Sequence, residues 1–328
     1  MELDTRLLTE LQNNFPFSSR PFLEIAKRIG CSEEEVIELT DHLQKKGIIR
    51  QISAIFHPEL FGHKTSLFAF RVPENRLEET IKVINSHPGV THNYLREHFY
   101  NIWFIMVVPP GTDIKEEGER IAKLCKIKNY LFLPAKRIFK ISTTFDIEAS
   151  GEGRQFSIES KANSLKLSNK DIELVKALQE PLPVEREPFK RIAMDIGVEE
   201  EYIFAWLKEM ESLNALRRFG ALLKHDKVGF RFNIMVAWRV SEDNLEEIAS
   251  KLVSLPFVSH CYERVSYPHW RYNLYTMCHF KDEREGFDVL KGLVKEVSPE
   301  DVIFLKTIKE LKKKRLKLFY EISFKKLN

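Results

Sequence analysis

The chain has 328 residues, of which 43% are apolar and 30% charged, and this composition is typical of a globular protein. Its formal net charge is only +3, which excludes an overall polycation of the kind that wraps nucleic acid. The acidic N-terminal stretch is unlike a signal peptide and no apolar run approaches the roughly 18 residues that span a bilayer, so we expect a cytoplasmic protein with no membrane partner.

The first elements predict a winged helix-turn-helix. Apolar residues recur at helical spacing over 3–14, Pro21 begins a second helix that ends near Gly30, and Ser32 opens a third through a capping box. The alternating stretch IIRQISAIF (48–56) follows and is typical of a strand. Three helices followed by a strand pair are the elements of a winged helix.

The next stretch reads as strand, helix, strand, strand, helix and strand. We expect these elements at 66–72, 76–86, 90–97, 101–108, 113–125 and 130–143. This order is that of a ferredoxin-like domain.

The whole pattern is then repeated. RPFLEIAKRIG (20–30) matches EPFKRIAMDIG 167 residues later, and HPGVTHNY (87–94) matches LPFVSHCY 168 residues later. The Tyr-Asn pair at Tyr100 returns at Tyr272, 172 residues later, so copy two carries a four-residue insertion around YPHW (267–270). Copy two therefore predicts ferredoxin-like elements at 232–240, 243–254, 257–265, 272–280, 284–297 and 301–320.

We expect an α+β protein in which two tandem copies form an intramolecular pseudo-dimer. The predicted domains are winged helices at 1–62 and 166–229 and ferredoxin-like domains at 63–146 and 230–328, joined by a polar, Gly/Ser-rich linker at 147–165. A further pairing of two chains into a homodimer stays an open alternative. The four cysteines are scattered without C-x-x-C spacing, which argues against a zinc or iron–sulfur site.

The helices that would enter DNA carry the wrong charge. The stretch 33–46 holds five acidic residues and two lysines, and 199–212 holds five acidic residues and one lysine. A helix in the major groove lies between phosphates and needs cationic or neutral polar side chains. Nucleic acid is therefore not expected as a partner, although a regulator that uses its wing stays an alternative.

The architecture resembles the Lrp/AsnC group of regulators, and a DNA-binding regulator that responds to heme or an amino acid is the alternative function. A narrower resemblance rests on REHFYNIWF (96–104) and WRYNLYTMCHF (270–280), with GIIRQISA (47–54) and LRRFGALL (216–223) upstream. These phrases resemble the two subunits of siroheme decarboxylase, here fused in one chain. The resemblance covers nearly the whole sequence.

This resemblance implies a carbon–carbon lyase of heme biosynthesis. The family removes the carboxyl groups of the C12 and C18 acetates of siroheme and yields 12,18-didecarboxysiroheme, for the alternative heme pathway or the denitrification heme pathway. It implies no cofactor beyond the iron tetrapyrrole of the substrate. A heme carrier without catalysis would share the same binding residues. Copy one ends its phrase in NIWF and copy two in NLYT, so the resemblance does not guarantee two exchangeable sites.

Strand alternation places a polar column on one face of each predicted sheet. In copy one the column is Val90, His92, Tyr94, Arg96 and, if the strand continues, His98. In copy two it is Val258, His260, Tyr262 and Arg264. A hydrogen-bonded polar interface between two sheets is the simpler interpretation, but two columns of one type favour a ligand site.

A tetrapyrrole with eight carboxylates needs cations at its rim and flat apolar walls at its faces. The fork of an arginine grips a carboxylate through two hydrogen bonds, worth roughly 1.5–3 kcal/mol each. The predicted substrate-binding residues are Arg50, Arg96, Arg217, Arg218, Arg264, Arg271, Trp103, Trp270 and Tyr262.

Decarboxylation also needs a proton for the carbon that loses its carboxyl group, and histidine titrates near neutrality. His98 and His269 are the leading candidates because each lies in a repeated phrase, and Tyr94, Tyr262 and His260 are secondary ones. Axial ligation of the substrate iron is a competing role for a histidine. We interpret His42, His87 and His225 as surface residues and the basic run KELKKKRLK (309–317) as a solvated strand face, with a nucleic-acid patch as its alternative.

Overall fold

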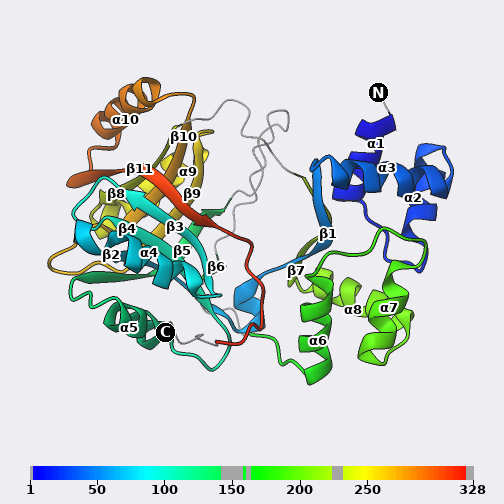
Figure 1. The fold of residues 1–328 in the computed structure, drawn as a ribbon. Helices are drawn as coiled ribbons and strands as arrows, with labels where there is room; N and C mark the ends of the chain where they lie inside the picture. The colour runs from blue at the N-terminus through cyan, green and yellow to red at the C-terminus, as the bar shows by residue number, and fades with distance from the viewer. Residues whose placement is uncertain (1–2, 142–157, 160–163, 224–231, 323–328) are drawn as a thin grey trace. The chain divides into compact units, whose positions relative to one another are not determined.

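The computed structural model describes residues 3–141, 158–159, 164–223 and 232–322. They form two compact units, and each unit draws on both copies of the repeat (Figure 1). The winged-helix unit contains residues 1–62, 164–226 and 317–319, and the ferredoxin-like unit contains 63–163, 227–316 and 320–328. Most of the predicted linker and the predicted boundary at 229 lie outside the described residues, and the division into four domains stays a prediction.

In the winged-helix unit, both copies have the three predicted helices followed by a strand, but the partner of that strand comes from the other copy and not from the same one as the predicted strand pair implied. Copy one contains α1 (Leu3–Asn13), α2 (Pro21–Ile29), α3 (Glu33–Lys45) and β1 (Ile49–Phe56), and copy two contains α6 (Asn169–Leu178), α7 (Pro188–Ile196), α8 (Glu200–Ser212) and β7 (Leu216–Leu223). Proline in the first turn and a left-handed glycine at the end bound both α2 and α7. Ser32 and Glu35 complete the predicted capping box of α3, whereas Glu199 gives α8 no side-chain cap.

The two winged helices share one antiparallel sheet made of β1 and β7, with Ile52 opposite Ala221. Helix α1 of copy one packs directly on β7 of copy two. Gly220 permits this approach, because a Cβ atom there would lie 2.5 Å from the carbonyl oxygen of Leu11. Each winged helix is therefore completed by the other copy.

The ferredoxin-like unit also has the predicted order. Copy one contains β2 (Lys64–Phe70), α4 (Leu77–Ser86), β3 (Val90–Arg96), β4 (Ile102–Val108), α5 (Ile114–Leu124) and β5 (Tyr130–Ile141), and copy two contains β8 (Phe232–Arg239), α9 (Leu245–Ser254), β9 (Val258–Arg264), β10 (Leu274–Phe280), α10 (Glu283–Val297) and β11 (Asp301–Lys313). The last strand ends at Lys313 and not at 320 as predicted. The backbone N–H of Lys314 still donates to the carbonyl oxygen of Thr91, and beyond it the chain leaves the sheet.

The strands of both copies join in one nine-stranded sheet, in which the short β6 (Ile158–Glu159) pairs with β5. Each C-terminal strand pairs first within its own copy, β5 with β2 and β11 with β8. It then runs on into the other copy, so β5 pairs with β9 and β11 with β3. These pairings close the sheet on itself, and every described strand of the unit except β6 belongs to the closed ring.

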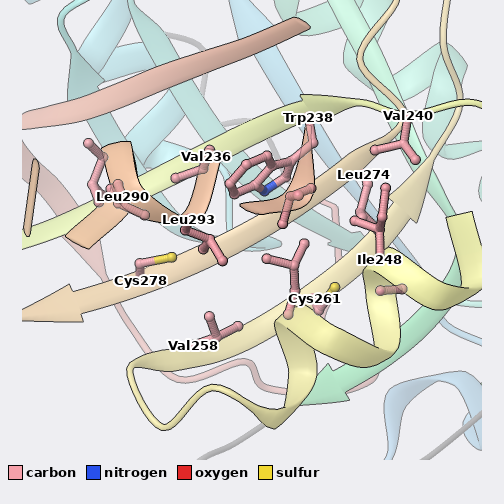
Figure 2. Close-up of a cluster of buried hydrophobic side chains, with 14 of the residues drawn as sticks. Val236, Trp238, Val240, Ile248, Val258, Cys261, Leu274, Cys278, Leu290 and Leu293 are labelled. Carbon is pink, nitrogen blue, oxygen red and sulfur yellow. The ribbon is translucent and has the colours of Figure 1, made fainter. Parts of the chain in front are cut away.

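Strand alternation divides the side chains between three cores. One face of the copy-one strands packs under α4 and α5, and the matching face of copy two packs under α9 and α10 around Trp238, Leu274 and Cys278 (Figure 2). The opposite faces meet in a third cluster, the inner cluster, which draws on both copies. It contains Leu67, Ala69, Tyr100, Trp103, Leu131, Leu133, Met235, Ala237, Trp270, Tyr275 and Leu305.

Candidate functional site between the two ferredoxin-like copies

The column of copy one lies on β3 and faces the inner cluster. Tyr94 pairs with Trp103 and His92 with Ile105 across β4, and paired residues point to the same face of a sheet. Asn93 instead reaches the helix side, where its amide donates to Asn85 at 2.9 Å. The prediction for Val90 is wrong, because a register shift between positions 90 and 92 turns this side chain toward the helix-covered core.

The column of copy two repeats this geometry on β9. Tyr262 pairs with Tyr275 and His260 with Met277, while Cys261 points to the helix side. A second register shift turns Val258 to the helix side as well, so its predicted place in the column is also wrong. Both columns therefore consist of a His, a Tyr and an Arg that share one face.

The local bonds of the two columns also correspond. Nδ1 of His92 lies 3.0 Å from the hydroxyl of Thr91, and Nδ1 of His260 lies 2.7 Å from that of Ser259. Burial lowers the pKa of His92 to about 4, and the nearby Lys313 contributes to the shift. His92 is therefore a neutral imidazole at neutral pH and supplies no cation to an anionic ligand.

Arg96 and Arg264 are almost fully buried and link the two copies. Arg96 donates from Nη1 to the carbonyl oxygen of Leu305 at 2.7 Å, and Arg264 donates from Nη1 to that of Leu133 at the same distance. Burial lowers the pKa of both guanidinium groups, to about 10 for Arg96. In each arginine the Nε atom is buried without a hydrogen-bond partner among the described residues. Each column therefore ends in a buried cation with an unused donor.

The two aromatic phrases, REHFYNIWF (96–104) and WRYNLYTMCHF (270–280), meet in the inner cluster, where Trp270 of copy two lies among side chains of copy one. Its ring centroid is 5.5 Å from His98, 5.6 Å from Tyr100 and 5.9 Å from Trp103. Its indole donates to the hydroxyl of Tyr275 at 2.6 Å. Trp103 is held in turn by a 2.6 Å bond from its indole to the carbonyl oxygen of Tyr100. The inserted residues of copy two thus fill space beside the phrase of copy one.

His98 does not continue the strand, because β3 ends at Arg96 and the chain turns through a bend. Its Nδ1 accepts a 3.1 Å bond from the backbone N–H of Tyr100, which places the proton of the neutral ring on Nε2. Burial lowers the pKa of His98. His98 is half-buried and lies beside Trp270, so it combines an apolar wall with a titratable nitrogen.

His269 and Arg271 lie in the inserted loop and are exposed. His269 stacks on Tyr267 at 5.7 Å, and the hydroxyl of Tyr267 donates to the carbonyl oxygen of Phe132. Arg271 donates to the carbonyl oxygen of Pro268 within the same loop. These two predicted residues therefore lie outside the buried cluster that Trp270 enters.

The remaining predicted arginines belong to the winged-helix unit. Arg50 lies on β1, and Arg217 and Arg218 lie on β7. Arg50 is exposed, whereas Arg217 and Arg218 are partly buried. Within the ferredoxin-like unit, the structure brings together predicted residues from both copies.

The sequence patterns missed the strand residues that face each column. Register pairs Arg96, Tyr94 and His92 with residues of β11, namely Thr307, Glu310 and Lys313. Arg264, Tyr262 and His260 pair with residues of β5, namely Ala135, Ile138 and Ile141. The unusual length of the two C-terminal strands was the available signal, because a strand that outruns its neighbours must find another partner.

The prediction that His87 is a surface residue is wrong, because its side chain is completely buried. Its Nε2 lies 2.8 Å from Glu117, which also accepts from Arg120. Burial opposes ionisation of Glu117, but these two partners outweigh it and lower its pKa to about 2. His42 is exposed as predicted, and His225 lies outside the described residues.

The basic run at 309–317 divides between strand and coil. Lys312 turns inward and donates to the carbonyl oxygens of Asn85 and His87 at the end of α4. Burial lowers its pKa to about 8. Within the described ranges no three His, Cys, Asp or Glu side chains are grouped to hold a metal ion, and no helix is long and apolar enough to cross a membrane.

Comparison with known proteins first defines the class. Residues 60–140 and 227–312 match the AsnC-like ligand binding domain, and residues 4–50 and 171–217 match the siroheme decarboxylase NirDL-like HTH domain. The chain is thus a tandem duplication of a helix-turn-helix domain and an AsnC-like ligand-binding domain, which confirms the predicted fold class.

The particular family follows from relatives that match along the whole chain. The chain is 33% identical to the siroheme decarboxylase of Hydrogenobacter thermophilus over 96% of its own length and 95% of the relative. It is 32% identical to the siroheme decarboxylase NirDL subunit of Paracoccus denitrificans over 88% of both chains. A crystal structure of the siroheme decarboxylase NirDL superposes with a TM-score of 0.80 at 28% identity, covering 97% of this chain and 95% of that one. The chain belongs to the siroheme decarboxylase family, as its repeated phrases predicted, and it carries both copies in one polypeptide.

Proposed function

We propose that this protein is a carbon–carbon lyase that converts siroheme to 12,18-didecarboxysiroheme by removing the carboxyl groups of the C12 and C18 acetates. The observation that carries the proposal is the meeting of the two family phrases around Trp270, with a buried arginine at the end of each column. The solved relative was also crystallised with an iron-uroporphyrin III analogue, and it covers 97% of this chain. An iron tetrapyrrole is therefore the proposed ligand.

The residues of the site match the needs of such a ligand. Tetrapyrrole carboxylates require cations, and the unused donors of Arg96 and Arg264 are charged and desolvated, which strengthens a bond to an anion. The flat faces of the ring require apolar walls, which Tyr100, Trp103 and Trp270 supply. The wing arginines Arg50, Arg217 and Arg218 and the exposed Arg271 remain proposed rim contacts.

The reaction breaks the bond between the acetate methylene and its carboxyl carbon, and carbon dioxide leaves. The electron pair stays on the methylene carbon and spreads into the macrocycle, so we propose no organic cofactor. A proton then converts that carbon to a methyl group. We assign this proton to Nε2 of His98 in its imidazolium form, because Nε2 is the ring nitrogen that the backbone N–H of Tyr100 does not contact. His269, Tyr94, Tyr262 and His260 remain the alternative donors, and axial ligation of the iron is the competing role.

A mass measurement on the intact chain tests the proposal. The protein is incubated with siroheme under anaerobic conditions, and the tetrapyrrole is analysed by mass spectrometry. The expected result is a loss of two carbon dioxide molecules, with release of carbon dioxide in the same proportion. An unchanged mass after prolonged incubation, with siroheme still bound, would leave a heme carrier as the better description.

A further inference from the structure

The two columns correspond residue by residue, but the strands that face them do not. The register of β11 against β3 and that of β5 against β9 are the same, with irregularities at corresponding positions. Each column residue of copy one therefore has a counterpart in copy two with the same neighbour geometry. The side chains that face the two columns from β11 and β5 are one clear difference between the copies.

Copy one faces a polar strand. Arg96 lies opposite Thr307, Tyr94 opposite Glu310 and His92 opposite Lys313. Glu310 and Lys313 are exposed, and Glu310 lies close enough to Tyr94 to help burial raise the pKa of that phenol to about 12. A carboxylate at this position repels any ligand whose rim consists of carboxylates.

Copy two faces an aliphatic strand. Tyr262 lies opposite Ile138 and His260 opposite Ile141, and both isoleucines are partly buried. Ala135 occupies the position of Thr307 and has no hydroxyl for Arg264. This face offers an apolar surface, and its strand places no carboxylate opposite the column.

The two arginines differ in their hydrogen bonds, because Thr307 faces Arg96 and Ala135 faces Arg264. Arg96 has two acceptors, the carbonyl oxygen of Leu305 and the hydroxyl of Thr307 at 2.9 Å. Among the described residues Arg264 has one acceptor, the carbonyl oxygen of Leu133. Both guanidinium groups also lie over the tyrosine of their own column, Arg264 at 4.7 Å from Tyr262 and Arg96 at 5.2 Å from Tyr94. Arg264 is 93% buried and keeps more of its five donors for another partner.

We propose that the two columns are unequal and that the copy-two column, formed by His260, Tyr262 and Arg264 against Ile138 and Ile141, receives the apolar face and a carboxylate of the tetrapyrrole. The copy-one column is the structural counterpart, in which Thr307 accepts a hydrogen bond from Arg96 and the carboxylate of Glu310 lies opposite Tyr94. This inference rests on the proposed function, because it names which side of that site holds the substrate.

A reciprocal exchange tests the inequality. Ile138→Glu gives the copy-two column the carboxylate of copy one, and Glu310→Ile gives the copy-one column the aliphatic side chain of copy two. Binding of iron-uroporphyrin III is measured by absorbance titration for the full chain and both variants. We expect Ile138→Glu to weaken binding at least tenfold and Glu310→Ile to change it less than twofold.

Two controls separate the possible failures. Ile138→Thr keeps the β-branched shape without a charge, and a loss of about threefold would support the same apolar contact even if Ile138→Glu does not fold. Equal effects of the exchanged pair, or a larger effect at Glu310, would overturn the inequality while leaving the proposed function intact. No binding by the unaltered chain would instead contradict the proposed function itself.

Discussion

The two units use the same duplication in different ways. In the winged-helix unit the charged side chains near the contact between copies pair with each other, as Arg20 does with Glu33 and Arg186 with Glu34. In the ferredoxin-like unit the copies exchange long strands, and Arg96 and Arg264 are buried with a donor unused. Paired charges satisfy one another, whereas buried donors without a partner suit a ligand. This difference supports the proposal that the chemistry takes place in the ferredoxin-like unit.

The largest expected effect is on activity, and it compares a histidine of the ferredoxin-like unit with one of the winged-helix unit. His98→Ala removes the proposed proton donor and should lower carbon dioxide release by about 10²–10⁴-fold. His42→Ala changes an exposed histidine of α3 in the winged-helix unit and should have no effect. Since burial lowers the pKa of His98, the unaltered enzyme should lose activity as the pH rises through a value below the usual 6.5.

The same assay decides between the predicted donors. Unchanged turnover by His98→Ala, together with a large loss for His269→Ala, would move the proton donor to the inserted loop. Unchanged turnover by both variants would exclude both histidines.

The contact between the aromatic phrases should dominate the stability of the ferredoxin-like unit. Trp270→Ala leaves a cavity among Tyr100, Trp103 and Tyr275 and should reduce the free energy of unfolding by about 3–5 kcal/mol. Phe99→Ala removes an exposed aromatic side chain nearby and should cost at most about 0.5 kcal/mol. Denaturant unfolding followed by circular dichroism measures both, and equal losses would show that Trp270 does not join the two copies.

The buried histidine of copy one predicts an acid sensitivity. The folded-state pKa of His92 is about 4 and its ordinary value 6.5, so the unfolded chain takes up the proton first as the pH falls. Stability is therefore retained above pH 6.5 and lost between about 6.5 and 4, by up to about 3 kcal/mol. His92→Gln should flatten the pH dependence of unfolding over this window, and an unaltered slope would contradict the burial.

The smallest effect compares the copies within the winged-helix unit. Ser32→Ala breaks the capping box of α3 and should lower stability by about 1 kcal/mol. Glu199→Ser would supply α8 with the cap that it lacks and should raise stability by a similar or smaller amount. Thermal unfolding of the two variants tests whether the copies differ only in this local bond.

Local patterns predicted the elements and the columns because both depend on neighbours in sequence. The alternation of His92, Tyr94 and Arg96 and the capping box at Ser32 are examples. Register shifts are not encoded by alternation, and this is why Val90 and Val258 were assigned to the wrong face. His98 was expected to join the column if the strand continued, but alternation does not encode where a strand ends, and β3 ends at Arg96.

Long-range partners were not predictable from these patterns. Nothing near residue 87 in sequence indicates that His87 meets Glu117 in a buried network. The same holds for the facing residues of β5 and β11, because the pairing of Ile138 with Tyr262 depends on a contact between copies. The repeat predicted a pseudo-dimer, but not which strands would cross between its halves.

The crossing of β11 into copy one also constrains synthesis. Strand β3 ends at Arg96, yet its partner β11 begins only at Asp301. At a translation rate of about 5–20 residues per second, the edge of β3 waits roughly 10–40 seconds for its partner to be made. During that time its backbone groups and inner aromatic side chains are open to chaperones or to the wrong strand. Fusing two copies in one chain guarantees each a partner, but it also makes the first copy depend on β11, a strand of the second copy that is translated much later.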